Sequence, residues 1–559
     1  MQRRIVTLSL IFFISFLLIS ARLFYWQIIS GESLSAEAES QRSDDLVIPA
    51  KRGEIKASDG SDLVSNQKAY LVYLEPRKMK NETQTVGSVA SILGLDVASV
   101  SASINRGSRY WVPIAHAVEE VKVSALKEKN FPGLGFEEED IRYYPEASMA
   151  AHLLGFVGKN AKGGDQGYFG IEGYYDLQLR GRSGYLRQEK DARGIPILMG
   201  DQKRVEPEDG RTLVLNMDKM VQFIVEKKLA EGIRKYGAAG GNVTVLNPVT
   251  GEILAMAGYP SYDPGYFKSY ESEIYKNPIV ADSYEPGSTF KALIMSSAIN
   301  EGLVTPQTSY DEKGPVEIGG YQIRTWNNQY GGKTTMTEVL ERSSNVGMVF
   351  VSEKLGHEKL FKYITSFGMG IPTGVDLEEE SSPAIRPYDN WYAIDFATAS
   401  FGQGIAVTPI QMITAVAALA NDGKLMEPHV VKKIISGSGK TIEIKPKIMR
   451  QVISPESAHI LSEMMVAAVD HGEAQFAKPK GYRIAGKTGT AQIALAGHYD
   501  ATKTIASFVG FAPAEKPRFV MLVTLREPSS SQWGSETAAP LFFSIARELF
   551  NYYGISPNE

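Results

Sequence analysis

An apolar run at the start of the chain constrains the fold more than any other stretch. Arg3 and Arg4 precede IVTLSLIFFISFLLISA (residues 5–21), which carries no charge, and Arg22 is followed by LFYWQII. If the Arg22 side chain extends to the membrane surface, the apolar length reaches the roughly 20 residues that a helix needs to cross a bilayer. The aromatic residues after Arg22 and the arginines before the run favour an anchor with a cytoplasmic N-terminus.

A signal peptide that is later removed is the alternative for this run. Cleavage after Ala21 would place the bulky Ile19 at the −3 position, and the run is long for the core of a signal peptide. We therefore expect residues 1–29 to be a cytoplasmic tip and a single-pass anchor in the cytoplasmic membrane. Almost all of the chain would then lie on the outer side, periplasmic or extracellular.

Length and composition exclude several classes of protein. A chain of 559 residues is expected to form two to four domains, and 43% hydrophobic with 22% charged residues is typical of globular folds. The net charge of −5 argues against nucleic acid as a partner. The chain has no cysteine, and its seven histidines show no metal-ligand spacing, so we expect no thiol chemistry, no metal and no cofactor.

Residue patterns change near the middle of the chain. RGEIKASDGSDLVSN (52–66) predicts a hairpin that turns at Asp59-Gly60, and GDQKRVEPEDGRT (200–212) predicts a linker. We expect a domain without obvious chemistry over 30–205 and a second domain over 206–559. In the second domain, strand patterns at both ends surround a helical middle, which predicts an antiparallel sheet whose edge strands come from both ends of the domain. These strand patterns cover 212–216, 242–257, 505–513 and 518–527.

Three short motifs follow one another in the second domain. Ser288-Thr289-Phe290-Lys291 is an S-x-x-K sequence that opens an apolar, helix-like run. Ser343-Ser344-Asn345 is an S-x-N sequence in a stretch with a helical pattern, and Lys487-Thr488-Gly489-Thr490 is a K-T-G sequence beside strand patterns. A lone S-x-x-K arises often by chance, but the three motifs in this order indicate a serine acyltransferase.

The chemistry explains why a lysine is needed beside the serine. A serine hydroxyl is a weak nucleophile and needs an adjacent base. Lys291 serves as a base only when it is neutral, whereas the usual pKa of a lysine is about 10.4. Burial and the positive charge of Lys487 would both lower the pKa of Lys291. Taken alone, the pattern also allows Ser288 to be a helix cap.

With these motifs the chain resembles the penicillin-binding proteins and serine β-lactamases. It is most similar to the class B penicillin-binding proteins, which are monofunctional peptidoglycan D,D-transpeptidases, and YEPGSTFK resembles the septal, division-type branch. The resemblance implies an α+β fold with an N-terminal transmembrane helix, an elongated pedestal domain and a C-terminal transpeptidase domain in which helices flank an antiparallel sheet. Further matching stretches are YEPGSTFK (284–291), FGQGIAVTPIQ (401–411), AGKTGTAQ (485–492), FVGFAPA (508–514), RYYPEASMAAHLLGFVG (142–158) and GIEGYYDLQLRG (170–181).

The resemblance also implies a role for each motif residue. Ser288 would attack the penultimate D-alanine carbonyl of a stem peptide, with the backbone N–H groups of Ser288 and Thr490 as the oxyanion hole. The implied catalytic set is Ser288, Lys291, Ser343, Asn345 and Lys487, and the implied substrate-binding set is Thr488, Gly489, Thr490, Ser344 and Trp326. DHGEAQFAKPKGY (470–482) departs from the family, whose members often show a Gly-Thr-type turn before K-T-G.

Not every motif in this domain requires a function. Thr408-Pro409-Ile410-Gln411 reads as a capping box with proline at the first helical position, so structure alone explains it. Glu139-Asp140 lacks the phenylalanine and histidine that follow the acidic pair of glycan-polymerising domains. A separate glycan polymerase is therefore expected as a partner.

The implied partners are donor and acceptor stem peptides, other membrane proteins of cell-wall synthesis and division, and β-lactams as covalent inhibitors. The alternatives are an elongation-type transpeptidase that maintains cell shape, a D,D-carboxypeptidase, and a β-lactam-sensing protein. The sequence offers no feature that identifies a base for deacylation by water.

Overall fold

The computed structural model describes residues 2–106, 110–161, 163–189, 197, 202–495 and 498–557. Its contacts divide the chain into two compact units, each of which combines segments that are distant in the sequence. The first unit is Met1–Arg52 with Arg180–Gly210, and the second is Gly53–Leu179 with Arg211–Glu559.

The first unit joins the N-terminal helices to a small antiparallel sheet with strand order β1-β8-β9. Its elements are α1 (Gln2–Phe24), a π-helical turn (Tyr25–Ile29), α2 (Gly31–Arg42), β1 (Ser43–Ile48), β8 (Gly184–Glu189) and β9 (Gln202–Val205). The span Gln2–Ile29 is long and apolar enough to cross a membrane. The predicted linker is wrong at Gln202–Val205, because these exposed residues pair with β8 as an edge strand, and residues 200–201 lie outside the described residues.

The second unit contains a mixed sheet with the order β19-β18-β10-β2-β3-β4, and β5 also pairs with β3. The strands are β2 (Ile55–Lys56), β3 (Asp62–Leu74), β4 (Val112–Val118), β5 (Leu134–Tyr143), β10 (Thr212–Leu215), β18 (Val431–Ile435) and β19 (Thr441–Glu443). The predicted Asp59-Gly60 turn joins β2 to β3, with Gly60 at φ +88°. β10, β18 and β19 lie beyond residue 205, so this sheet draws strands from both predicted domains.

Short helices and a hairpin complete the N-terminal part of this unit. They are α3 (Glu82–Leu93), α4 (Val97–Arg106), α5 (Glu120–Glu128), α6 (Ala151–Leu154), β6 (Phe156–Lys159), β7 (Asp165–Tyr168), α7 (Gly170–Tyr174) and α8 (Asp176–Leu179). The buried Asp376 carboxylate accepts hydrogen bonds from the Tyr175 hydroxyl at 2.9 Å and from the backbone N–H groups of Val430 and Val431. These bonds fix the α7–α8 segment to the start of β18.

An antiparallel sheet with the order β12-β11-β23-β22-β21 forms the centre of the C-terminal part. Its strands are β11 (Gly240–Leu246), β12 (Ile253–Tyr259), β21 (Ala485–Leu495), β22 (His498–Ala512) and β23 (Phe519–Arg526). One edge strand comes from the start of the domain and the other from its end, as predicted. β23 is buried on both faces: Met521 and Val523 contact one apolar cluster, whereas Val520 and Leu522 contact another.

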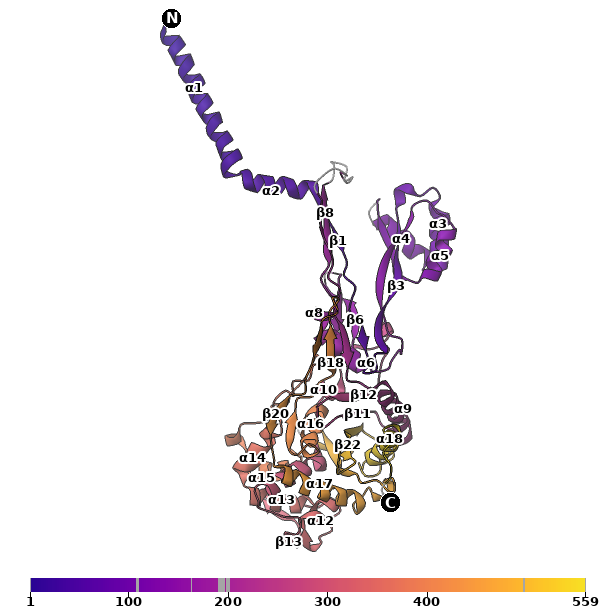
Figure 1. The fold of residues 1–559 in the computed structure, drawn as a ribbon, viewed down its shortest axis with the longest axis vertical. Helices are drawn as coiled ribbons and strands as arrows, with labels where there is room; N and C mark the ends of the chain where they lie inside the picture. Colours follow the sequence, from indigo (N-terminus) through magenta and orange to yellow (C-terminus); the bar gives the residue numbers. More distant parts are fainter. Residues whose placement is uncertain are drawn as a thin grey trace. The chain divides into compact units, whose positions relative to one another are not determined.

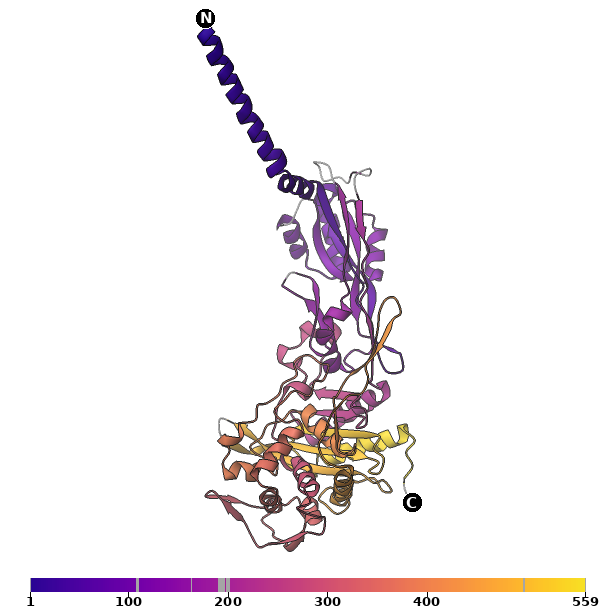
Figure 2. The same ribbon diagram turned by 60° about the vertical axis from the view of Figure 1, so that its left-hand side comes forward.

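Helices cover both faces of this central sheet. α9 (Lys219–Tyr236) and α18 (Ala538–Tyr552) lie side by side on one face (Figure 1). Figure 2 shows the helices of the orange middle segment beside the yellow C-terminal strands. The remaining helices are α10 (Pro278–Ala281), α11 (Lys291–Asn300), α12 (Met336–Glu341), α13 (Asn345–Leu355), α14 (His357–Ser366), α15 (Ala393–Ala399), α16 (Pro409–Leu419) and α17 (Pro455–Asp470). The predicted capping box is confirmed, because Thr408 and Gln411 cap α16 reciprocally.

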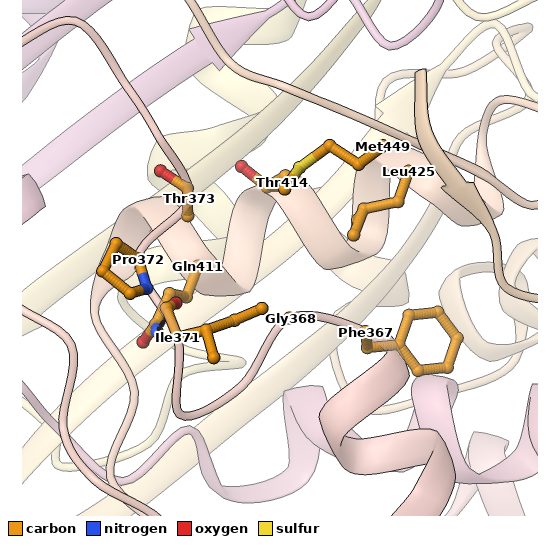
Figure 3. A pocket seen from close by; sticks show the side chains of 9 residues that line it. All are labelled: Phe367, Gly368, Ile371, Pro372, Thr373, Gln411, Thr414, Leu425 and Met449. Atoms are coloured by element: carbon orange, nitrogen blue, oxygen red, sulfur yellow. Dashed lines mark hydrogen bonds between the residues drawn. The ribbon is translucent and has the colours of Figure 1, made fainter. Parts of the chain in front are cut away.

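Short strands connect these helices. They are β13 (Ser309–Glu312), β14 (Val316–Ile318), β15 (Tyr321–Ile323), β16 (Gly332–Thr335), β17 (Lys424–Met426) and β20 (Ile448–Gln451). A cavity of about 10 Å³ lies where Gln411 and Thr414 of α16 approach Phe367 and Met449 (Figure 3). A cavity of this size holds at most one water molecule, so it is not a site for a peptide.

Candidate active site

Ser288 lies in a 3-10 turn, Gly287–Phe290, that continues directly into α11. The turn is held from outside, because the Gly287 N–H donates to the Gly402 carbonyl at 3.0 Å. Gly402 has φ +77°, and a Cβ there would overlap the Gly287 carbonyl oxygen. The G-Q-G sequence at 402–404 therefore supports the turn that carries Ser288.

Lys291, one turn after Ser288, is fully buried and bonded to the S-x-N motif. Its Nζ donates to the Ser343 carbonyl at 2.6 Å and to Asn345 Oδ1 at 2.8 Å, and it lies 3.2 Å from Ser343 Oγ. A neutral amine has two N–H groups, which match the two oxygens at the shorter distances, and a lone pair that remains to accept a proton. Ser288 is partly exposed, and its Oγ makes no hydrogen bond to a described residue.

Burial and a neighbouring charge give Lys291 the properties of a base. Burial lowers the pKa of Lys291 well below its usual value, and the positive charge of Lys487 lowers it further. The carboxylates of Glu473 and Glu312 act in the opposite direction. Glu473 belongs to the 470–482 loop that departs from the family pattern, so this loop contributes charge to the site.

The S-x-N motif forms a break between two helices, so the predicted helix is wrong at Ser343 and Ser344. α12 ends at Glu341, Ser343 adopts φ +54°, and Ser344 caps α13 by accepting from the Gly347 N–H at 2.9 Å. The break directs the Ser343 carbonyl at Lys291. Serine is a favoured N-cap residue, so a capping signal at Ser344 was present in the sequence.

Ser344 lies away from the surface, although it was expected to contact substrate. The residue is 2% exposed, and its Oγ donates to the carboxylate of Glu312. Both hydrogen-bonding functions of the hydroxyl are therefore used inside the protein, one by Glu312 and one by Gly347.

The K-T-G motif lies on edge strand β21, beside the Ser288 turn. Lys487 is 4% exposed, its Nζ donates to Thr488 Oγ1 at 3.1 Å, and burial lowers its pKa to about 8. Gly489 makes the close approach possible, since a Cβ there would overlap Ser507 Oγ and lie 2.8 Å from Thr289 Cγ2. Thr490 Oγ1 accepts from the Gly534 N–H at 3.0 Å.

Two tryptophans connect the surroundings of the S-x-N and K-T-G motifs. Trp326 is 46% exposed, and its ring centroid lies 5.2 Å from that of Trp533. Trp326 follows Arg324, whose carbonyl accepts from Asn345 Nδ2 at 3.1 Å, and Trp533 precedes Gly534. Trp533 was not predicted, because the sequence carries no signal that places the 529–537 segment beside the K-T-G strand.

The comparisons with known proteins agree with this geometry. Residues 241–549, more than half of the chain, match the family described as "Penicillin binding protein transpeptidase domain". Residues 47–215 match the "Penicillin-binding Protein dimerisation domain". The chain belongs to the penicillin-binding proteins. Its pair of domains makes this penicillin-binding protein a class B enzyme, a peptidoglycan D,D-transpeptidase, and the predicted family, fold class and activity are confirmed.

Relatives match this penicillin-binding protein over nearly its full length. It is 34% identical to Stage V sporulation protein D of Bacillus subtilis, with 100% of this chain and 87% of the relative covered. It is 30% identical to the peptidoglycan D,D-transpeptidase FtsI homolog of Mesostigma viride, over 99% and 96% of the two chains. The crystal structure of penicillin-binding protein 3 from Mycobacterium tuberculosis, complexed with aztreonam, matches with a TM-score of 0.72, 27% identity, and coverage of 92% and 98%.

Proposed function

We propose that this enzyme cross-links stem peptides through an acyl-enzyme on Ser288, with Lys291 as the base. One observation carries the proposal. The buried Nζ of Lys291 lies 2.6–3.2 Å from Ser343 and Asn345, one turn after a partly exposed serine. A buried lysine with a lowered pKa beside a free hydroxyl is the arrangement that activates a serine.

In acylation and in the transfer step that follows, each proton that leaves one group is accepted by another. Lys291 accepts the Ser288 proton as Oγ attacks the penultimate D-alanine carbonyl, and the backbone N–H groups of Ser288 and Thr490 stabilise the oxyanion. The bond to the terminal D-alanine breaks, and its nitrogen receives the proton from Lys291 through Ser343. An amine of a second stem peptide attacks the ester, forms the cross-link and returns a proton to Ser288.

Substrate binding is assigned to the K-T-G strand and its neighbours. Lys487, Thr488 and Thr490 bind the terminal carboxylate of the donor, or the carboxylate of a β-lactam that mimics it. Gly489 allows β21 to approach the Ser288 turn, and Asn345 holds the donor amide while it orients Lys291. The exposed ring of Trp326 supplies an apolar wall, whereas Ser344 positions the turn and does not contact the peptide.

For the domains and the membrane placement, we propose the assignment that the sequence predicts. We assign residues 1–29 to a cytoplasmic tip and single-pass anchor, 30–205 to a pedestal, and 206–559 to the transpeptidase domain. The apolar span Gln2–Ile29 supports the anchor. The catalytic domain then lies outside the cytoplasmic membrane, where its peptidoglycan substrate is found, and a separate membrane polymerase supplies the glycan strands.

The cellular role that we propose is cross-linking at the division septum. The YEPGSTFK sequence and the FtsI homolog among the relatives support it. The relative from Bacillus subtilis, which is named for sporulation, supports a second candidate, wall synthesis during spore formation. Depletion in growing cells separates the two: filaments indicate septal work, and normal growth with defective spores indicates the second. Round cells would indicate an elongation role.

The test of the reaction is a cross-linking assay. The full-length enzyme in detergent micelles is mixed with a lipid-linked precursor and a separate glycan polymerase, and the muropeptides are separated. We expect dimeric muropeptides with the wild type and none with Ser288→Ala. If the products are monomers shortened by one D-alanine, the enzyme is a carboxypeptidase. If covalent β-lactam labelling occurs with neither product, the protein is a sensor.

A further inference from the structure

A buried carboxylate on β13 lies directly behind the S-x-N turn. Glu312 is 3% exposed, and its Oε1 accepts hydrogen bonds from the Ser344 hydroxyl and from the Tyr310 hydroxyl, the latter at 2.6 Å. Its Oε2 accepts from the Gly331 N–H at 3.1 Å. These donors come from β13 itself, from the turn before α13, and from the segment that leads into β16.

Within the described residues, no lysine or arginine forms an ion pair with Glu312, so its partners are neutral. An ionised carboxylate that is buried with neutral donors only is costly. The part of the site that Glu312 contacts is the Ser343–Ser344 turn, through the Ser344 hydroxyl. A serine at φ +54° is strained and holds this conformation only when its surroundings impose it.

Two hydrogen bonds and the Ser343–Ser344 peptide connect Glu312 to the base. Glu312 holds the hydroxyl of Ser344, and Ser344 is joined by one peptide bond to Ser343, whose carbonyl accepts from Lys291 Nζ at 2.6 Å. The hydroxyl of Ser344 also accepts from the Gly347 N–H at 2.9 Å, which fixes the first turn of α13 and so the position of Asn345. Both oxygens closest to Lys291 Nζ therefore depend on the residue that Glu312 holds.

We propose that Glu312 is a positioning residue for acylation: its carboxylate locks the Ser343–Ser344 turn against β13 and keeps a negative charge near Lys291. This proposal rests on the proposed function of Ser288 and Lys291. The charged groups that act on Lys291 are Lys487 on β21, Glu473 after α17 and Glu312 on β13. Burial and Lys487 lower the pKa of Lys291, and the two carboxylates oppose them.

The test compares three variants by the rate of acylation with a fluorescent penicillin, resolved into the binding constant and the limiting rate. Glu312→Gln keeps the shape but removes the charge and the acceptor for Gly331. We expect its limiting rate to fall by about tenfold or more, because the Gly331 N–H loses its acceptor and the Ser344 and Tyr310 hydroxyls lose a charged acceptor. Tyr310→Phe keeps the ring stacked on Phe350 and the charge of Glu312 but removes one donor, so a smaller loss of the limiting rate is expected.

Asp311→Asn is the matched control, since it removes the same charge from the exposed side chain that directly precedes Glu312 on β13. We expect its acylation rate to stay within about twofold of the wild type. The pH profile provides the readout that a purely structural residue would not change. Acylation needs neutral Lys291, and loss of the Glu312 charge lowers the pKa of Lys291, so the acid limb moves to lower pH in Glu312→Gln. It stays in place in Tyr310→Phe and in Asp311→Asn.

The proposal is overturned if Glu312→Gln acylates at the wild-type rate, or if its acid limb does not move. If Glu312→Gln fails to fold, Tyr310→Phe decides: a wild-type limiting rate in that variant rejects the positioning role. Ser288→Ala is measured alongside. If Ser288→Ala still forms the covalent adduct, the proposed function fails. If it forms none while Glu312→Gln and Tyr310→Phe behave as wild type, only the role of Glu312 fails.

Discussion

At the scale of single residues, the proposed mechanism assigns opposite tasks to two buried lysines. In that mechanism Lys291 is neutral and accepts a proton, whereas Lys487 is charged, attracts a carboxylate and lowers the pKa of Lys291. Sequence reasoning predicted this pair, because the motifs name both residues. It did not find Glu312 or Trp533, because each reaches the site through a strand or loop whose placement no short motif encodes.

The pH dependence of acylation tests the charge on Lys487. Its pKa is lowered to about 8 by burial, so the fraction that is charged falls as pH rises above that value. We expect the acylation efficiency with a β-lactam to decline above about pH 8, through weaker binding. Arginine stays protonated throughout the measured pH range, so the alkaline limb should disappear in Lys487→Arg. An unchanged limb in Lys487→Arg would show that another group titrates.

At the scale of elements, the strands and helices with strong patterns were predicted correctly from the sequence. Two assignments were wrong, each for a different reason. β9 was read as a linker, because an exposed edge strand of polar residues has the composition of a loop. The S-x-N stretch was read as one helix, because helical residues flank it on both sides, whereas the positive φ of Ser343 has no sequence signal in a serine. Elements were thus predictable where burial of one face imposed a periodic pattern of apolar residues along the sequence.

The contact between the Ser288 turn and the G-Q-G segment joins two segments that are distant in the sequence. In Gly402→Ala, a Cβ would overlap the Gly287 carbonyl, so the turn that carries Ser288 must shift. We expect acylation to fall roughly ten- to a hundredfold, because small displacements of a nucleophile are costly. Gly404→Ala is the control: φ is +75°, but the nearest atom to the new Cβ is Thr398 Oγ1 at 3.4 Å. It should lose stability but acylate at nearly the wild-type rate, and equal losses in both variants would contradict the contact.

At the scale of the whole molecule, sequence motifs predicted the family and the order of its parts, but not how the sheets share strands. The sheet around β2 and β3 includes β10, β18 and β19 from beyond residue 205, although the sequence suggested a change of domain there. Such pairing between distant segments depends on the packing of the complete chain, and a reading by local periodicity cannot find it. The S-x-x-K and K-T-G motifs were easier to place, since one leads into α11 and the other lies on β21.

If Ser288 carries the acyl group, a covalent penicillin adduct can be located on this residue. The full-length enzyme is treated with a fluorescent penicillin, and the labelled peptide is identified by mass spectrometry. Ser283→Ala, which removes an exposed serine five residues earlier, serves as the control. We expect the wild type and Ser283→Ala to carry the label on Ser288, and Ser288→Ala to carry none. A stable adduct on Ser288→Ala, or a label on any other residue of the wild type, would contradict the account.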